Sequence, residues 1–336
     1  MDTNTLRNRA VIAGIGNTEY SSASGRSELR LGLEACLAAI ADAGVDRREI
    51  DGLARFGVSQ TGASEAWMAT NLGLRNLSYW ESVDYGGTAA PALIGHAAAA
   101  VACGLAKYVL CYRTVNGRSG LRPGTSDTYE RLLRGGDPSF DNFLVPYGMT
   151  APTQTFGLIT RRHMRQFGTT REQLGRVAVT FRANAQANPG AQMFGRTMTM
   201  EEYFAAPLIS DPLGKYDCCL QTDGAAAVLV TTPERAADLR ARPVFVAGAV
   251  QASLPDIQGP LHSMLGRPDI TETPGATAAR ALYEQTGMTP SNVDVAQLYD
   301  CFTITALLQI SATSRPMVRC RSTPTAGTSL PGTSTV

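Results

Sequence analysis

The feature that most constrains the fold is a pattern that occurs twice, once toward each end of the chain. Each copy opens with an apolar segment that contains glycine, at residues 10–16 and 244–249. Each closes with a helix-ending glycine, a short turn, an aspartate and a second apolar segment, at residues 43–53 and 286–296. A match of this kind indicates an internal duplication. We therefore expect two related βαβ halves in one chain.

Glycine and aspartate mark the same points in the two copies. Gly44 and Gly287 each stand where helical periodicity stops, which is typical of a helix C-cap. Asp51 and Asp294 then precede apolar residues, and we expect each aspartate to lead into a strand.

The first half contains two further recognisable pieces. Residues 27–43 carry apolar side chains on one face at helical spacing, with Ser27 as a candidate N-cap. Two apolar segments, residues 79–83 and 107–112, flank an alanine-rich helix over residues 88–104 that has no Asp, Glu, Lys or Arg. Such a helix is buried on all sides, so we expect a strand, a tight turn, a buried helix and a second strand.

The chain divides into three parts by composition. An N-terminal half is predicted over residues 8–235, with an insertion at about 113–210 that lies over one face of the sheet. A partial C-terminal half is predicted over residues 243–310. Helices are expected within the insertion and a strand after it, at about residues 153–167, 171–187, 200–206 and 222–230.

The last 26 residues, 311–336, differ from everything before them. Fourteen are Ser, Thr or Pro, and none is acidic or aromatic. A disordered tail is one interpretation. We favour a second, in which a reading-frame shift after about Ile310 replaced the original C-terminus, because a βαβ half needs a final helix and strands to complete its layers.

Charge and cysteine content exclude several classes of protein. The net charge is +1 without a basic block, so a nucleic-acid partner is not expected. No apolar run reaches about 18 residues, so no membrane span is expected. Seven cysteines without framework spacing fit reduced thiols in a cytoplasmic protein. The three histidines are scattered and no CxxC pair occurs, so no metal site is expected.

Several short motifs together resemble the thiolase superfamily, in its sterol-carrier-protein-like branch, over about residues 8–310. The resemblance implies an α/β thiolase fold, a duplicated βαβαβ core in five layers, α-β-α-β-α, with the second half incomplete here. The segments that carry it are Gly168–Leu174, Asn188–Met193, Ile209–Leu213, Asp217-Cys-Cys219, Thr222–Ala225 and Tyr299-Asp-Cys-Phe302.

Two departures from the family pattern narrow the range of activities that this chain is expected to have. Thiolases place a nucleophilic cysteine at the turn before the first buried helix, where the helix N-terminus favours the thiolate. The turn here, residues 84–87, has no cysteine, and the nearest, Cys103, follows more than four helical turns later. Related thiolases also have His-Asp-Cys-Phe where this chain has Tyr299-Asp-Cys-Phe302. These departures resemble the retro-aldolases of bacterial steroid side-chain degradation, which lack the nucleophilic cysteine and cleave a β-hydroxyacyl-CoA.

The resemblance implies roles for particular residues. Tyr299 would take the proton of the substrate hydroxyl group; the alternative is a core tyrosine with its hydroxyl group bonded. A second tyrosine, in a C-terminal segment that this chain does not contain, would protonate the enolate. His163 and Arg161, in an arginine-rich helix, could contact the phosphates of coenzyme A, although such a helix face is usually only solvated.

The turn before the buried helix has two possible uses. Asp84, Tyr85, Gly86 and Gly87 could form only a tight turn, or could offer backbone N–H groups to the thioester oxygen. No covalently bound cofactor is expected, and coenzyme A enters as part of the substrate.

The family also implies partners. A homodimer would pair the strands near residues 79–83 and 107–112 across a two-fold axis, because an apolar edge strand left exposed is a liability. A partner with an OB-fold and a zinc-ribbon domain is implied by the aldolase resemblance. Two other functions stay open: an acetyl-CoA acyltransferase, and a non-catalytic subunit that binds lipid-CoA.

Overall fold

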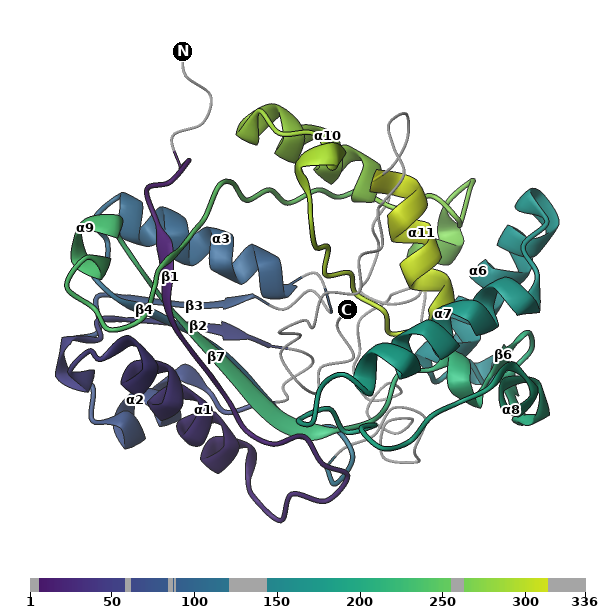
Figure 1. Cartoon of the computed structure of the whole chain (residues 1–336), viewed down its shortest axis with the longest axis horizontal. Helices are drawn as coiled ribbons and strands as arrows, with labels where there is room; N and C mark the ends of the chain where they lie inside the picture. Colours follow the sequence, from purple (N-terminus) through teal and green to yellow (C-terminus); the bar gives the residue numbers. More distant parts are fainter. Residues whose placement is uncertain are drawn as a thin grey trace. The chain divides into compact units, whose positions relative to one another are not determined.

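The computed structural model describes residues 6–57, 62–83, 87, 89–120, 144–254 and 263–313. The chain forms two compact units that each draw on several stretches of sequence (Figure 1). Unit 1 comprises residues 1–120, 222–251 and 280–288, and unit 2 comprises residues 121–221, 252–279 and 289–336.

Unit 1 is built on a six-stranded mixed sheet in the order β3-β2-β4-β7-β1-β8. Strand β2 runs parallel to β3 and β4, whereas β7 lies between β4 and β1 and is antiparallel to both. The strands are β1 (Val11–Asn17), β2 (Gly52–Phe56), β3 (Tyr79–Val83), β4 (Val109–Asn116), β7 (Asp223–Thr231) and β8 (Val244–Phe245). The strands predicted for the first half are confirmed.

Helices cover both faces of this sheet. Helices α1 (Glu28–Ala43) and α2 (Glu65–Leu72) pack on one face, and α3 (Ala89–Ala102) packs on the other (Figure 1). Because successive strand residues point to opposite faces, Leu53 joins the α1 side and Ala54 the α3 side. The prediction that the alanine-rich helix is buried on all sides is wrong, because only the face that packs on the sheet is buried. Ala97, Ala98 and Ala100 are at or below 2% exposed, whereas Ala90 and Pro91 are exposed.

The predicted caps are present. The Ser27 hydroxyl group accepts a hydrogen bond from the backbone N–H of Arg30 at 3.2 Å. Gly44 ends α1 in the left-handed conformation with φ of 76°, and Gly287 follows α10 (Gly275–Thr286) with φ of 66°. Both repeated glycines therefore end helices.

Strand β1 and helix α1 approach more closely than side chains would allow. A Cβ atom on Gly16 would lie 2.2 Å from the carbonyl oxygen of Ala35, and one on Gly14 would lie 2.3 Å from that of Ala39. These neighbours are backbone atoms that cannot move aside. The glycines in the opening segment are therefore required for packing the helix on the sheet.

The second copy of the pattern diverges from the first after its aspartate. The Asp51 carboxylate accepts the backbone N–H groups of Lys107 and Tyr108 at 2.8 and 3.0 Å and so fixes the start of β4. Asp294 is exposed, and the prediction of a strand after it is wrong. Val293 and Val295 are 41% and 57% exposed, so in the described ranges this stretch has no partner strand to satisfy its backbone.

The strand of residues 107–112 is interior rather than at an edge. Strand β4 pairs with β2 on one side and β7 on the other. The prediction that it takes part in a dimer contact is therefore wrong, because both of its backbone edges are already hydrogen-bonded. Strand β3 is a terminal strand of the sheet in the part of the chain that the structure describes.

Unit 2 is mostly helical. The predicted helices of the insertion are confirmed. Its elements are α6 (Pro152–Phe167), α7 (Arg171–Ala185), α8 (Met200–Ala205), the hairpin β5 (Leu208–Ser210) with β6 (Leu213–Gly214), and α11 (Thr303–Thr313). Shorter helices elsewhere are η1 (Arg47–Glu49), η3 (Val145–Tyr147), η4 (Lys215–Asp217), α9 (Pro233–Ala236), η5 (Ser263–Gly266) and η6 (Pro290–Asn292).

The structure does not test several of the predictions made from the sequence. Residues 314–336, most of the atypical tail, lie outside the described residues. The division into halves at 8–235 and 243–310, and the placement of the insertion over the sheet, stay predictions. Among the described helices, none is both long and apolar enough to cross a membrane.

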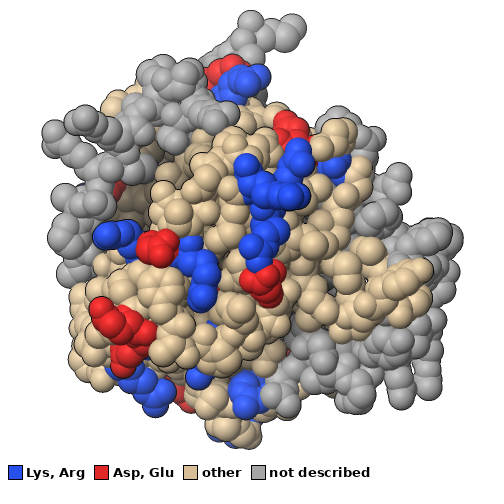
Figure 2. Space-filling model, turned by 90° about the vertical axis from the view of Figure 1, so that its right-hand side faces the viewer, with Lys and Arg blue, Asp and Glu red and all other residues tan. Residues whose placement is uncertain are grey.

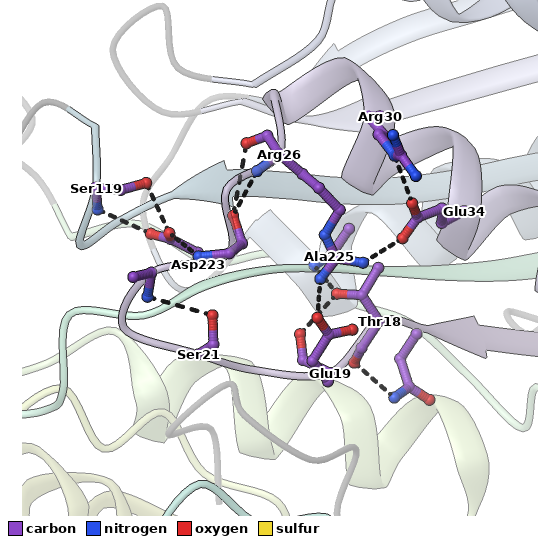
Figure 3. Close-up of polar contacts among 12 residues, drawn as sticks. Thr18, Glu19, Ser21, Arg26, Arg30, Glu34, Ser119, Asp223 and Ala225 are labelled. Atoms are coloured by element: carbon purple, nitrogen blue, oxygen red, sulfur yellow. Dashed lines mark hydrogen bonds and ion pairs between the residues drawn. The ribbon is translucent and has the colours of Figure 1, made fainter.

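A buried carboxylate organises the loops at the start of β7 (Figure 3). Asp223 accepts the backbone N–H groups of Ser24, Arg118 and Ser119 at 2.9–3.0 Å, and the Ser119 hydroxyl group at 2.6 Å. Burial acts to raise the pKa of Asp223, but the hydrogen bonds from Ser119, Ser24 and Arg118 outweigh it and hold the pKa well below its usual range. The ionised carboxylate thus joins two loops to the sheet.

Replacing Gly16 with alanine is predicted to destabilise unit 1 by about 3 kcal/mol, because the new methyl group overlaps the backbone of α1. Denaturant unfolding followed by circular dichroism measures the change. Gly266→Ala is the matched control, since a Cβ atom there meets nothing within 4 Å. Equal stability of the two variants would contradict the close packing.

Asp223→Asn is predicted to lower the unfolding free energy by about 2 kcal/mol at neutral pH, because the charge-assisted hydrogen bonds are lost. The folded-state pKa is depressed, so the carboxylate stabilises the protein above its unfolded pKa of about 3.9 and ceases to do so as the pH falls further. The deficit of the variant should therefore shrink below about pH 4. A deficit that is constant from neutral pH to pH 3, measured by denaturant unfolding, would refute this assignment; exposed Asp294→Asn is the control.

Candidate active site

Two motifs that are far apart in the sequence lie against each other in unit 2. Cys218 forms an isolated antiparallel bridge with Phe302, and the backbone N–H of Cys219 donates to the carbonyl oxygen of Cys301 at 3.0 Å. The segment that follows η4 therefore supports the segment that carries Tyr299. We refer to residues 299–303 as the Tyr299 segment.

Apolar packing fixes the far end of this segment. The Phe302 ring stacks on Phe156 of α6 with ring centroids 4.6 Å apart. Ile304 and Leu308 of α11 join the same core as Ile159 and Leu174. Helix α11 is thus anchored to α6 and α7, and the Tyr299 segment leads into its first residue.

The carboxylate of Asp217 is the buried polar centre of this region. It accepts hydrogen bonds from the Tyr203 hydroxyl group at 2.8 Å, the Thr303 hydroxyl group at 2.7 Å and the backbone N–H of Gly214 at 2.7 Å. Burial, together with the nearby Asp217, raises the pKa of Tyr203. Tyr203 therefore keeps its proton and remains a donor.

A cation lies close to this centre. The Arg171 guanidinium packs over the rings of Tyr203 and Phe204, at 5.5 and 5.4 Å from their centroids. Its Nη2 atom and the Oδ2 atom of Asp217 both lie 3.6 Å from the point that a Cβ atom on Gly214 would occupy. Arg171 thus places a positive charge beside the buried carboxylate.

Tyr299 is 39% exposed, which is not consistent with the alternative of a core tyrosine. Its backbone is held by one side chain: the N–H donates to Gln309 Oε1 at 3.4 Å, and the carbonyl oxygen accepts from Gln309 Nε2. The main chain of Tyr299 is therefore held in place, and its side chain is partly exposed to solvent. This combination suits a group that acts on a bound molecule.

The neighbouring thiols are poor nucleophiles. Burial raises the pKa of Cys301 to about 12, with smaller opposing effects from hydrogen bonds with Thr305 and Tyr299. Burial, and then the charge of Asp217, raises the pKa of Cys218 to about 12. Both thiols therefore stay protonated at neutral pH. Cys103, which is exposed, lies just beyond the C-terminal end of α3, at the opposite end from the turn.

The predicted turn before α3 is largely outside the described residues. This applies to Asp84, Tyr85 and Gly86, whereas Gly87 is described as a half-buried residue before the helix. The proposed use of this turn, to offer backbone N–H groups to the thioester oxygen, therefore stays a prediction.

Arg161 and His163 lie on α6 but are not brought together. Arg161 is half exposed and forms an ion pair with Asp211. The His163 ring packs on Phe167, and its Nδ1 atom lies 2.7 Å from the Thr169 hydroxyl oxygen. Burial lowers the pKa of His163, although the Asp269 charge opposes this. Of the two, Arg161 is the better candidate to contact a phosphate, because His163 is neutral at physiological pH.

Basic side chains gather in a band on the face shown in Figure 2. Helices α6 and α7 together contain six arginines and one acidic residue, Glu172. The arginines are Arg161, Arg162, Arg165, Arg171, Arg176 and Arg182. Arg171 packs inward over Tyr203 and Phe204, and Arg161 is paired with Asp211, so the other four arginines provide most of the excess positive charge. A surface with an excess of positive charge favours an anionic ligand.

Sequence reasoning missed the residues that organise the site. Asp217 was part of a recognised motif, which was the available signal, but its partners Tyr203 and Thr303 are 14 and 86 residues away. The role of Gln309 could not be predicted from the sequence, because its hydrogen bonds with Tyr299 exist only in the folded chain.

Comparisons with known proteins agree with this arrangement. The family model for the thiolase N-terminal domain matches residues 10–234, and that for a thiolase C-terminal domain-like region matches residues 261–314. A steroid side-chain-cleaving aldolase of Thermomonospora curvata is 41% identical over 308 residues, which cover 91% of this chain and 77% of the relative.

Two further proteins are similarly close. The 17-hydroxy-3-oxo-4-pregnene-20-carboxyl-CoA lyase of Mycobacterium tuberculosis is 40% identical over 310 residues, covering 91% of this chain and 78% of the relative. The solved structure of an "Ltp2-ChsH2(DUF35) aldolase" superposes with a TM-score of 0.83 at 39% identity, covering 93% of this chain and 78% of that chain. Matching family models, sequence identity and fold together show that the chain belongs to the thiolase superfamily, alongside its steroid side-chain-cleaving aldolases.

Proposed function

We propose that the protein cleaves a carbon–carbon bond in the side chain of a steroid β-hydroxyacyl-CoA by a retro-aldol reaction. One observation carries the proposal: Tyr299, which is 39% exposed, stands on a main chain held by Gln309, beside thiols that burial keeps protonated. The similarity to steroid-cleaving aldolases supports the substrate class.

The reaction needs a base and a place for negative charge, but no covalent nucleophile. A base removes the proton of the β-hydroxyl group, the bond between the α and β carbons breaks, and the β carbon becomes a ketone. The electron pair of the broken bond passes into the thioester as an enolate, which is then protonated at the α carbon. Tyr299 is the proposed base: its phenolate oxygen accepts the hydroxyl proton and becomes the phenol, in general acid–base catalysis by a positioned side chain.

The enolate oxygen requires donors in a site that excludes water. The N-terminal end of α3, preceded by Asp84, Tyr85, Gly86 and Gly87, is the proposed source of these backbone N–H groups. The phosphates of coenzyme A are proposed to lie on the basic band, with Arg161 as a contact and His163 as a weaker one. Coenzyme A enters as part of the substrate.

The aldolase relative of known structure supports a partner protein, which we propose to carry an OB-fold and a zinc ribbon. We also propose a homodimer through the open edge of β3, where Trp80 is 66% exposed. The reduced thiols fit a cytoplasmic location.

Acetyl-CoA acyltransferase activity is the second candidate function, since a relative that is 29% identical is named an acetyl-CoA acetyltransferase. It would need an activated thiol. A non-catalytic subunit that binds lipid-CoA is the third, and it would bind the substrate without turnover.

Tyr299→Phe is predicted to lower kcat about 10²- to 10⁴-fold, because the proton acceptor is lost while the ring remains. The assay follows cleavage of 17-hydroxy-3-oxo-4-pregnene-20-carboxyl-CoA by the chain together with its partner protein. Tyr108→Phe, in the core of the sheet, is the control and should retain activity. Full activity of Tyr299→Phe would rule out the proposed role.

Incubation with acetyl-CoA is predicted to leave every cysteine unmodified, because burial keeps the thiols of Cys218 and Cys301 protonated. Mass spectrometry of the acid-quenched protein checks this, with a thiolase that forms an acetyl-enzyme as the positive control. Stoichiometric acetylation of one cysteine would instead select the acyltransferase function.

A further inference from the structure

The Tyr299 segment is held at its two ends by side chains from outside it. Gln309 binds the backbone of Tyr299 at one end. At the other end, the Thr303 hydroxyl group donates to Asp217 at 2.7 Å. Between these ends, the segment contacts residues 218–219 through a bridge and one backbone hydrogen bond. The direction in which Tyr299 points therefore depends on both anchors.

The anchor at Asp217 is rigid because the carboxylate is buried and shared. Asp217 is 1% exposed, and its three donors come from different elements: Tyr203 in α8, Gly214 in β6, and Thr303 at the start of α11. A buried charge that loses a donor cannot recover it from water. The surrounding segments must then move to restore the missing hydrogen bond.

We propose that Asp217 is a positioning residue for catalysis, which acts through Thr303 to set the orientation of Tyr299 toward the substrate hydroxyl group. In this role Asp217, which is 1% exposed, acts without contacting the substrate. Tyr203 and Arg171 hold the carboxylate in place, and Thr303 transmits its position to the segment. The inference rests on the proposed function and deepens it by assigning the group that aligns the base.

The test compares two substitutions at Thr303 that differ in one hydroxyl group. Thr303→Val removes the donor at constant shape and should lower kcat about 10- to 100-fold with KM unchanged, because a misplaced base slows the chemical step but not binding. Thr303→Ser keeps the donor and should restore kcat to within about twofold of the original chain, since serine supplies the same donor group. The assay uses the same steroid thioester with the chain and its partner protein.

A control separates positioning from stability. Thr160 is fully buried, and its hydroxyl group donates to the Phe156 carbonyl within its own helix. Thr160→Val should cost comparable thermal stability and leave kcat unchanged. If Thr303→Val does not fold, Tyr203→Phe removes another of the three donors and keeps the ring, so it carries the same test.

Combining the substitutions at Thr303 and Tyr299 distinguishes the proposed function from the positioning inference. If Thr303 acts through Tyr299, adding Thr303→Val to Tyr299→Phe should lower the residual rate no further. Full activity of Tyr299→Phe alone overturns the proposed function. A normal rate for Thr303→Val, or a loss that appears in KM, while Tyr299→Phe is inactive, overturns only the positioning inference.

Discussion

The candidate site depends on the burial of one carboxyl group, that of Asp217. Removing a carboxylate from water costs several kcal/mol, which only several good hydrogen bonds offset. Asp217 obtains three, from Tyr203, Gly214 and Thr303, with the Arg171 charge nearby. Because these donors come from separate elements, the charge can be satisfied only when the elements are assembled. The same requirement fixes the start of α11 and so the Tyr299 segment.

In unit 1 a second buried aspartate, Asp223, holds loops to the mixed sheet. This sheet accepts helices on both faces, and Gly14 and Gly16 let α1 approach the backbone of β1. Asp223 then gathers donors from two loops at the start of β7. In both units an aspartate from a recognised motif serves as a structural acceptor.

Local features of the fold could be predicted from the sequence, and long-range pairings could not. The caps at Ser27 and Gly44 depend on neighbouring residues, so periodicity located them. The strand expected after Asp294 failed because the pattern specifies a strand only where a partner strand lies beside it. Tyr299 was found by resemblance to a motif. Its anchors, Asp217 and Gln309, became apparent only when the fold brought them to the segment.

Cleavage without a covalent intermediate is the central claim, and the fate of the α carbon tests it most directly. The chain and its partner protein would act on 17-hydroxy-3-oxo-4-pregnene-20-carboxyl-CoA in deuterated water, with products followed by mass spectrometry. The account predicts equal amounts of a 17-ketosteroid and propanoyl-CoA, with one solvent deuteron at the α carbon of the thioester. Release of free coenzyme A, or an acyl group retained on the protein, would contradict it.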